Sequence, residues 1–246
     1  METSYKLRKI IHTIRLIYNK FERLYIRSSV KRYEAYLRKK GIKIGKNIYW
    51  GNIHSISIDI SRPCLLEIGD NVRLDSGLTI LTHDYACYVF KLVYKDYVGA
   101  SAKVTIGNNV YFGNNCTVLK GVTIGDNCII GTGSIVTKDI PANSVAVGVP
   151  AKVISGLEGY YKKRKIQSIE EAKNYAREIK RHYKRTPQIE DFEEEFALFW
   201  MPEAKTTTKF RHRIEHQQLS GIYNDFIERH KPIYNSFEEF LDDCNF

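Results

Sequence analysis

The chain has 246 residues, of which 43% are hydrophobic, and it carries a formal net charge of +10. This hydrophobic content is enough for a buried core, so the composition excludes an intrinsically disordered protein. No apolar run approaches the roughly 20 residues that a membrane-spanning helix needs, and the first residues mix charge throughout instead of forming a signal-peptide core. We therefore expect a globular protein of the cytoplasm.

The positive charge is concentrated near the start, where residues 1–40 hold 12 Lys or Arg and three Glu. Apolar residues recur there at spacings of three and four from Tyr5 onward, which predicts one or two amphipathic helices that end at Gly41. Such a basic helix can pack on the open end of the following domain, which we favour, or lie peripherally on the inner face of a membrane. We expect no nucleic-acid partner.

A six-residue repeat fills the middle of the chain. Between residues 104 and 140 an aliphatic or aromatic residue recurs at every sixth position: Ile106, Phe112, Val118, Ile124, Ile130 and Val136. This period fits a solenoid of short strands, in which each hexad supplies one strand and one tight corner. Gly and Asn at the corners, as in Asn108-Asn109 and Asp126-Asn127, provide the positive φ angles that tight corners require.

The repeat begins earlier but is interrupted. Ile44 and Ile68 lie in similar units, and because their spacing of 24 equals four hexads, we expect residues 42–80 to run in register. The next clear unit, at Ile106, is 38 residues beyond Ile68, which is not a multiple of six. This break predicts a loop insertion at residues 81–103, and loops on a rigid scaffold often carry function.

The composition changes after a turn at residues 148–150. Ser168 and Ser236 each precede glutamates with capping-box spacing, which predicts that each begins a helix. The expected organisation is a helical segment at 1–40, a β-solenoid at 41–156 and an α-helical extension at 157–246. The pattern indicates no function for the extension. The five cysteines form no CxxC pair, so buried thiols are favoured over disulfides or metal ligands.

The stretch GVTIGDNCIIGTGSIVTKDIPANSVAVGVPAKVI resembles the closing coils of the left-handed parallel β-helix, or hexapeptide-repeat, acyltransferases. Within that family it is most similar to the maltose and galactoside O-acetyltransferase branch, and the resemblance covers about residues 42–156. It implies a mainly β chain folded as a left-handed parallel β-helix. It also implies a homotrimer that binds acetyl-CoA, as co-substrate, in the groove between neighbouring subunits.

The same resemblance implies that His83, at the start of the insertion, is the general base. A neutral imidazole within about 3 Å of an acceptor hydroxyl can remove its proton as the oxygen attacks the thioester. This direct transfer requires neither an acyl-enzyme nor a metal. Asp84 could orient the imidazole or bind the acceptor, Asp75 is a candidate acceptor ligand or a plain corner residue, and Tyr85 could stack on a sugar or simply pack.

Aligned with the family, five residues become candidate coenzyme contacts: Asn114, Thr132, Thr137, Lys138 and Lys152. The two lysines would meet the phosphates, and the smaller polar side chains would line the pantetheine arm, although corner structure alone explains the latter equally well. The family often has Trp where this chain has Tyr111, and Arg where it has Lys152.

The leading hypothesis is an acetyl-CoA-dependent O-acetyltransferase that acts on a hydroxyl of a sugar or polysaccharide, of the capsule or lipopolysaccharide type. A small xenobiotic acceptor and a non-catalytic hexapeptide-repeat scaffold remain alternatives. A zinc-dependent carbonic anhydrase of the same fold needs three histidines, and the repeat region holds only His54 and His83.

Overall fold

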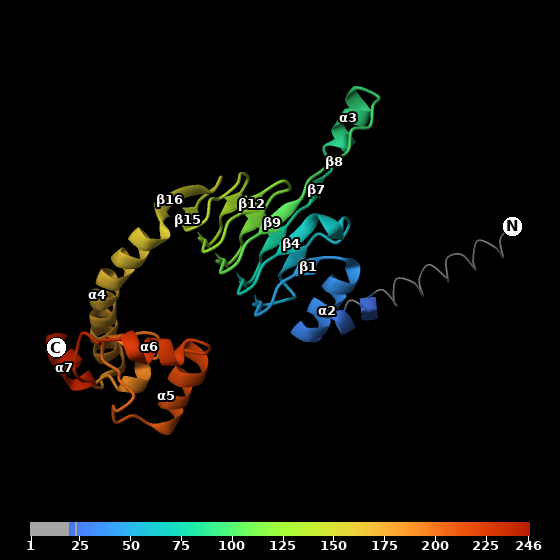
Figure 1. The fold of residues 1–246 in the computed structure, drawn as a ribbon. Coiled ribbons are helices and arrows are strands. Elements are labelled where there is room, and N and C mark those ends of the chain that lie inside the picture. The colour runs from blue at the N-terminus through green and yellow to red at the C-terminus, as the bar shows by residue number, and fades with distance from the viewer. Residues whose placement is uncertain (1–19, 23) are drawn as a thin grey trace. The chain divides into compact units, whose positions relative to one another are not determined.

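A computed structural model describes residues 20–22 and 24–246. The chain divides into two compact units, with the boundary between Tyr160 and Tyr161. Figure 1 shows the elements of each unit. Within the described residues, no helix is both long enough and apolar enough to cross a bilayer.

Successive strands of the first unit enter three parallel sheets in turn. Sheet A contains β1 (Lys43–Ile44), β4 (Leu66–Ile68), β9 (Val104–Ile106) and β12 (Thr123–Ile124). Sheet B contains β2 (Tyr49–Trp50), β5 (Arg73–Leu74), β10 (Tyr111–Phe112), β13 (Ile129–Ile130), β15 (Ser144–Val147) and β16 (Lys152–Gly156). Sheet C contains β3 (Ser57–Ile58), β6 (Thr79–Ile80), β11 (Thr117–Val118) and β14 (Ile135–Val136). The chain thus turns through an AB, a BC and a CA corner in every coil.

The hexad residues form the core of this three-sided coil. Successive side chains of a strand point to opposite faces, so each short strand directs one residue inward. All six predicted positions are buried, with Phe112 and Val118 fully so, and they belong to one cluster with the earlier Ile44, Leu74 and Ile80. Burying each such side chain contributes about 1.5–3 kcal/mol, which makes the periodic residues the main source of coil stability.

An asparagine ladder runs along the AB corner. Its members are Asn47, Asn71, Asn109, Asn127 and Asn143, and each has φ between 54° and 58°. The side-chain amide of each donates to the side-chain oxygen of the next, over 2.8–3.1 Å. Asparagine tolerates the left-handed conformation and here also satisfies its own amide, so the predicted corner role of Asn109 and Asn127 is confirmed.

The first coil is larger than the sequence pattern predicted. Ile44 pairs directly with Ile68, so the 24 residues between them make one turn of three strands and not four hexads. The additional residues lie in the corners at 51–56 and 59–65, the second of which contains the 3₁₀ helix η1 (Pro63–Leu65). Period alone could not distinguish four short units from three strands with longer corners.

The insertion is more ordered than the loop that the sequence suggested. β7 (His83–Asp84) pairs antiparallel with β8 (Ala100–Ser101), and α3 (Cys87–Val93) lies between them. Figure 1 shows this ribbon and its terminal helix leaving the coil at the CA corner. The backbone N–H of Leu81 still donates to the carbonyl of Val118, so the coil continues up to the base of the ribbon.

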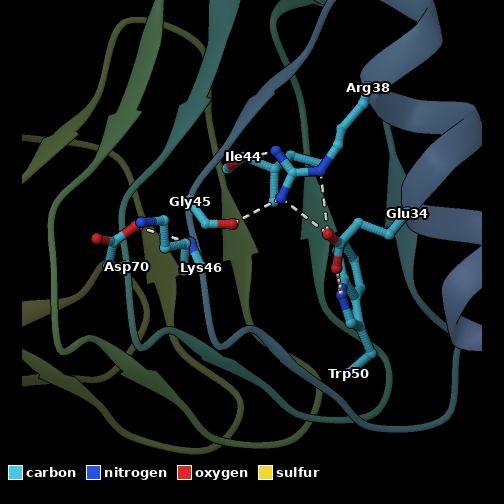
Figure 2. Close-up of polar contacts among 7 residues, drawn as sticks. All are labelled: Glu34, Arg38, Ile44, Gly45, Lys46, Trp50 and Asp70. Carbon is cyan, nitrogen blue, oxygen red and sulfur yellow. Dashed lines mark hydrogen bonds and ion pairs between the residues drawn. The ribbon is translucent and has the colours of Figure 1, made fainter.

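The helix α2 (Val30–Lys40) closes the first end of the coil. It buries Tyr33 and Leu37 within the coil's own hydrophobic cluster. The Glu34 carboxylate accepts hydrogen bonds from Arg38, at 2.8 Å, and from the indole N–H of Trp50, at 3.0 Å. Arg38 also donates to the carbonyls of Ile44 and Gly45, as Figure 2 shows.

The predicted helix end at Gly41 is confirmed, because this glycine has φ 108° and its N–H caps the carbonyls of the last turn. The helix α2 packs on the end of the coil, which is the interpretation favoured above for this segment. Most of the remaining predicted helix, at residues 1–19 and 23, lies outside the described residues, and so does any membrane contact made there.

The last strands close the other end of the coil. β15 pairs parallel with β13, after which β16 turns back antiparallel to β15. The predicted turn lies between them and contains a cis Val149–Pro150 peptide bond. The chain then enters α4 (Leu157–Tyr183), whose first N–H donates to the carbonyl of Asn143.

The second unit is helical, as predicted. Beyond α4 it contains η2 (Ile189–Asp191), η3 (Phe196–Leu198), α5 (Thr208–Arg213), the π-helical η4 (Ile214–Gln218), α6 (Tyr223–Arg229) and α7 (Phe237–Asp243). An aromatic core that includes Phe192, Phe199, Trp200 and Phe240 holds these short helices together.

One predicted helix start in this unit is confirmed and one is wrong. Ser236 caps α7 by accepting from the N–H of Glu239. Ser168 lies inside α4, where its hydroxyl donates to the carbonyl of Lys165. The six residues directly before it, Lys162 to Gln167, are mostly Lys, Arg and Gln, which are good helix formers, and contain no Pro or Gly, so the helix continues through the serine.

Candidate active site

His83 stands at the CA corner, where the coil gives way to the inserted ribbon. The residue before it, Thr82, is fully buried, and its carbonyl accepts from the N–H of Ala102 across the base of the ribbon. The imidazole itself is only 16% exposed. Its backbone is thus held on both sides, by the coil before it and by pairing with Ser101 after it.

A buried carboxylate contacts this imidazole. Nδ1 of His83 lies 2.5 Å from Oδ2 of Asp59, a residue that directly follows β3 in the preceding coil. The β3–β6 pairing aligns Ile58 with Ile80, and it brings the two following segments to the same corner. The Asp59 side chain is 6% exposed, so solvent screens this contact little.

Other donors surround the Asp59 carboxylate. Oδ2 accepts from the N–H and the hydroxyl of Thr82, at 3.0 and 2.6 Å, and Oδ1 accepts from the N–H and the hydroxyl of Ser61, at 2.9 and 2.7 Å. Burial on its own would raise the pKa of Asp59, but the hydrogen bonds from Thr82, Ser61 and His83 outweigh it and hold that pKa far below its usual range. The carboxylate therefore stays ionised at neutral pH.

An ionised carboxylate can only accept, so the hydrogen-bond pattern assigns the proton of a neutral His83 to Nδ1. The Ser61 hydroxyl is already committed to Asp59, and its oxygen lies 3.1 Å from the same Nδ1. Nε2 is then left with a lone pair. This arrangement suits a general base whose orientation and tautomer are set by its carboxylate partner.

The other candidates near His83 have different surroundings. The ring of Tyr85 meets the imidazole edge to face, with centroids 4.9 Å apart. Asp84 does not orient the imidazole, because its carboxylate pairs with Lys120 at 3.0 Å and accepts from the N–H of Ala86. These two contacts lower the pKa of Asp84, the Ala86 hydrogen bond most strongly.

All the remaining candidates except Lys152 divide between two corners. Thr137 and Lys138 follow a strand of sheet C and are exposed, and they lie at the CA corner, where His83 also lies. Asp75, Asn114 and Thr132 precede strands of sheet C and lie at the BC corner. Within one chain, the CA-corner candidates and the BC-corner candidates therefore lie at opposite ends of the strands of sheet C.

The candidates away from the CA corner have the following contacts. Asp75 accepts a hydrogen bond from Arg73, at 3.0 Å. Asn114 and Thr132 belong to successive coils, and the carbonyl of Asn114 accepts from the N–H of Gly133. Lys152 begins β16 and is exposed.

The cysteines are free thiols. Cys116 and Cys128 are buried in the coil, as predicted, and burial raises the pKa of both thiols. Cys64 is exposed in η1. A buried neutral thiol is a poor nucleophile, which agrees with direct transfer from the thioester.

Sequence reasoning did not find Asp59, Ser61 or Lys120. A usable signal existed for the first of these. Asp59 and His83 are 24 residues apart, close to the 22-residue interval that separates the paired Ile58 and Ile80 at the same corner. Counting back about one coil from His83 therefore leads to the neighbourhood of the aspartate.

Comparison with known proteins identifies the family of this chain. The family model for bacterial transferase hexapeptide repeats matches residues 103–138. Protein CapG of Staphylococcus aureus is 34% identical over 161 residues, which cover 65% of this chain and 90% of the relative. The chain belongs to the hexapeptide-repeat acyltransferases.

A second family relative is the galactoside O-acetyltransferase of Escherichia coli, which is 35% identical over 57% of this chain and 79% of its own length. Among solved structures, a galactoside acetyltransferase in complex with coenzyme A is 32% identical over 53% of this chain and 72% of that chain, with a TM-score of 0.37. A maltose O-acetyltransferase from Clostridium difficile also gives a TM-score of 0.37, at 31% identity over 52% of this chain and 76% of that chain.

Proposed function

We propose that this hexapeptide-repeat protein is an acetyl-CoA-dependent O-acetyltransferase that acts on a sugar or polysaccharide hydroxyl, of the capsule or lipopolysaccharide type. The observation that carries the proposal is the contact between His83 and Asp59, which leaves Nε2 of a neutral imidazole free to accept a proton. The name of the Escherichia coli relative supports a sugar acceptor.

The proposed step is direct. Nε2 of His83 takes the proton of the acceptor hydroxyl as its oxygen attacks the thioester carbonyl carbon of acetyl-CoA. The carbon–sulfur bond then breaks, and the coenzyme thiolate takes the proton from the imidazolium. Asp59, held ionised by Thr82 and Ser61, stabilises the positive imidazolium between these two events.

The distribution of the candidate residues favours a site shared between copies. Asn114 and Thr132 lie at the BC corner, whereas His83, Thr137 and Lys138 lie at the CA corner. In the homotrimer of left-handed coils that the family resemblance implies, the BC corner of one copy would meet the CA corner of its neighbour. Acetyl-CoA would then lie between them, with Lys138 and Lys152 near its phosphates and Asp75, Asp84 and Tyr85 toward the acceptor.

The test is release of free coenzyme A thiol from acetyl-CoA in the presence of monosaccharides, nucleotide sugars and polysaccharides. Wild-type protein should release thiol with at least one glycan, and His83→Asn should reduce kcat by about 10²–10⁴-fold, the usual contribution of a general base. His182→Asn is the matched control, because His182 is an exposed histidine of α4, outside the coil. Undiminished transfer by His83→Asn would remove the proposed base.

A small xenobiotic acceptor is a distinct outcome of the same assay. Thiol release with small hydroxylated antibiotics and with none of the glycans would replace the sugar acceptor and leave the chemistry at His83 intact. Absence of both turnover and acetyl-CoA binding would instead favour a scaffold.

A further inference from the structure

The enlarged CA corner of the first coil places a cation beside the proposed base. Ser61, whose oxygen lies 3.1 Å from Nδ1 of His83, is followed directly by Arg62. Consecutive Cα atoms are only about 3.8 Å apart, so the Arg62 backbone is next to the imidazole pocket. Pro63 then begins η1, and the N–H of Leu65 donates to the carbonyl of Arg62 at 3.0 Å, which holds this backbone in place.

The nearby Asp59 carboxylate does not form an ion pair with Arg62. Asp59 already accepts five contacts, from Thr82, Ser61 and His83. The Arg62 side chain is exposed, and within the part of the chain that the structure describes no ion pair joins it to a carboxylate. A single chain therefore presents a guanidinium with unused donors at the edge of the site.

Aromatic rings from the inserted ribbon stand on the same side. Tyr85 contacts the imidazole edge to face and is 73% exposed, and Tyr97 is 70% exposed. A hydrogen bond with Cys87 raises the pKa of Tyr97, and the nearby charge of Arg62 opposes that rise. Tyr85 thus lies against His83, and Tyr97 lies near enough to both Tyr85 and Arg62 for their charges to act on it.

These groups have complementary chemistry for one kind of ligand. Guanidinium binds carboxylate and phosphate oxygens with two parallel hydrogen bonds, and exposed tyrosine rings offer flat surfaces to a sugar ring. A neutral sugar would use the rings and leave the guanidinium without a counter-charge. An anionic sugar would use both.

On the basis of the proposed transfer reaction, we infer that the acceptor is a sugar carrying an anionic group, and that Arg62 is the residue that selects for it. The anion pairs with the guanidinium of Arg62 while the ring packs against Tyr85, and this brings a hydroxyl of the same sugar toward Nε2 of His83. The shared chemistry is a carboxylate, as in a uronic acid, or a phosphate, as in a sugar phosphate.

The test compares three acceptors that share one ring: galactose, galacturonic acid and galactose 1-phosphate. Initial rates of transfer from acetyl-CoA are measured for the wild type, Arg62→Gln and Arg62→Lys, with Lys46→Gln as a control for loss of one exposed positive charge at the distant AB corner. We expect at least one anionic sugar to exceed galactose in kcat/KM by about 10-fold to 10²-fold, as a hydrogen bond to a charged group would give. Comparison of the rates with galacturonic acid and with galactose 1-phosphate shows whether the preferred anion is a carboxylate or a phosphate.

Arg62→Gln should remove this preference by raising the KM for the anionic sugar, with kcat, the KM for acetyl-CoA and the rate with galactose unchanged. Arg62→Lys should keep part of the preference, because it retains the charge but not the planar donor pair. An equal loss for all three sugars would overturn the inference in favour of a structural role. A rise confined to the KM for acetyl-CoA would overturn it in favour of the coenzyme phosphates.

A binding measurement separates this inference from the transfer reaction. Saturation-transfer NMR with the same three sugars reads contact with the protein without turnover. Binding of an anionic sugar that Arg62→Gln abolishes and His83→Asn preserves supports the selection by Arg62 even if no acetyl group is transferred. Equal binding of all three sugars, or binding of none, overturns it whatever the result for transfer.

Discussion

Nδ1 of His83 lies 2.5 Å from Oδ2 of Asp59, although 24 residues separate them in the chain. The contact exists because one enlarged coil lies between the two residues and returns the chain to the same corner. The contact with Asp59 fixes the orientation of the His83 imidazole, as a general base requires.

Asp59→Asn should lower kcat by about 10²–10⁴-fold and leave the KM for acetyl-CoA nearly unchanged, because the asparagine no longer fixes the tautomer or stabilises the imidazolium. Steady-state kinetics of thiol release measures both quantities. Asp84→Asn is the matched control, since Asp84 pairs with Lys120 and not with the imidazole, and it should cost much less kcat. If Asp84→Asn lowered kcat more than Asp59→Asn does, Asp84 and not Asp59 would be the carboxylate that orients the imidazole.

The depressed pKa of Asp59 predicts how stability depends on pH. Because the folded-state pKa lies below the ordinary value of 3.8, the carboxylate contributes stability that is fully present above that pH. The contribution is lost as the pH falls further, toward the folded-state pKa. Urea unfolding of wild type and Asp59→Asn should therefore show a difference in the free energy of unfolding that narrows as the pH falls below about 4. A gap that widens in acid would contradict the assignment.

The asparagine ladder predicts a conformational effect that can be separated from a hydrogen-bonding effect. Asn109→Ala should destabilise the coil by about 2–3 kcal/mol, because it loses two amide contacts and places alanine at φ 54°. Asn109→Gly loses the same contacts but tolerates the positive φ, so its loss should be smaller by about 1 kcal/mol. Chemical unfolding measures both, and equal losses would mean that the left-handed conformation adds no cost.

The contacts of Glu34 predict that α2 is held to the coil by this carboxylate. Glu34→Ala removes the acceptor of the Trp50 indole and of Arg38, and it should lower the free energy of local opening of α2 by about 1 kcal/mol. Amide hydrogen exchange in residues 30–40 measures this opening. Lys31→Ala, on the exposed face of the same helix, should have little effect, and an equal loss there would indicate helix propensity as the cause.

Much of the fold could be predicted from local pattern. Ile106 and its five partners are buried as the period indicates, and Asn109, Asn127, Gly41 and Ser236 take the turn and cap conformations that their residue types favour. These features depend on near neighbours in sequence. Ser168 shows the limit of the same reasoning, because a capping pattern does not begin a helix where good helix formers precede it.

The site could be predicted only in part. The family resemblance and the break in the register together predict His83, but its partner Asp59 lies in a corner that the six-residue count misread. Asp84, adjacent in sequence, turns instead to Lys120 because β7 pairs with β8 and leads its side chain away from the imidazole. At this corner the carboxylate that contacts His83 is therefore Asp59, which is distant in sequence, and not the adjacent Asp84.

The sequence by itself determined the repeating coil, its buried series and the point where the repeat breaks, because each is set by one residue type recurring at one interval. The tertiary structure alone decided which carboxylate meets His83. It also decided that Asn114 and Thr132 lie at one corner and Thr137 and Lys138 at another. The physical reason is that corner length, which period does not specify, determines which residues of successive coils come together.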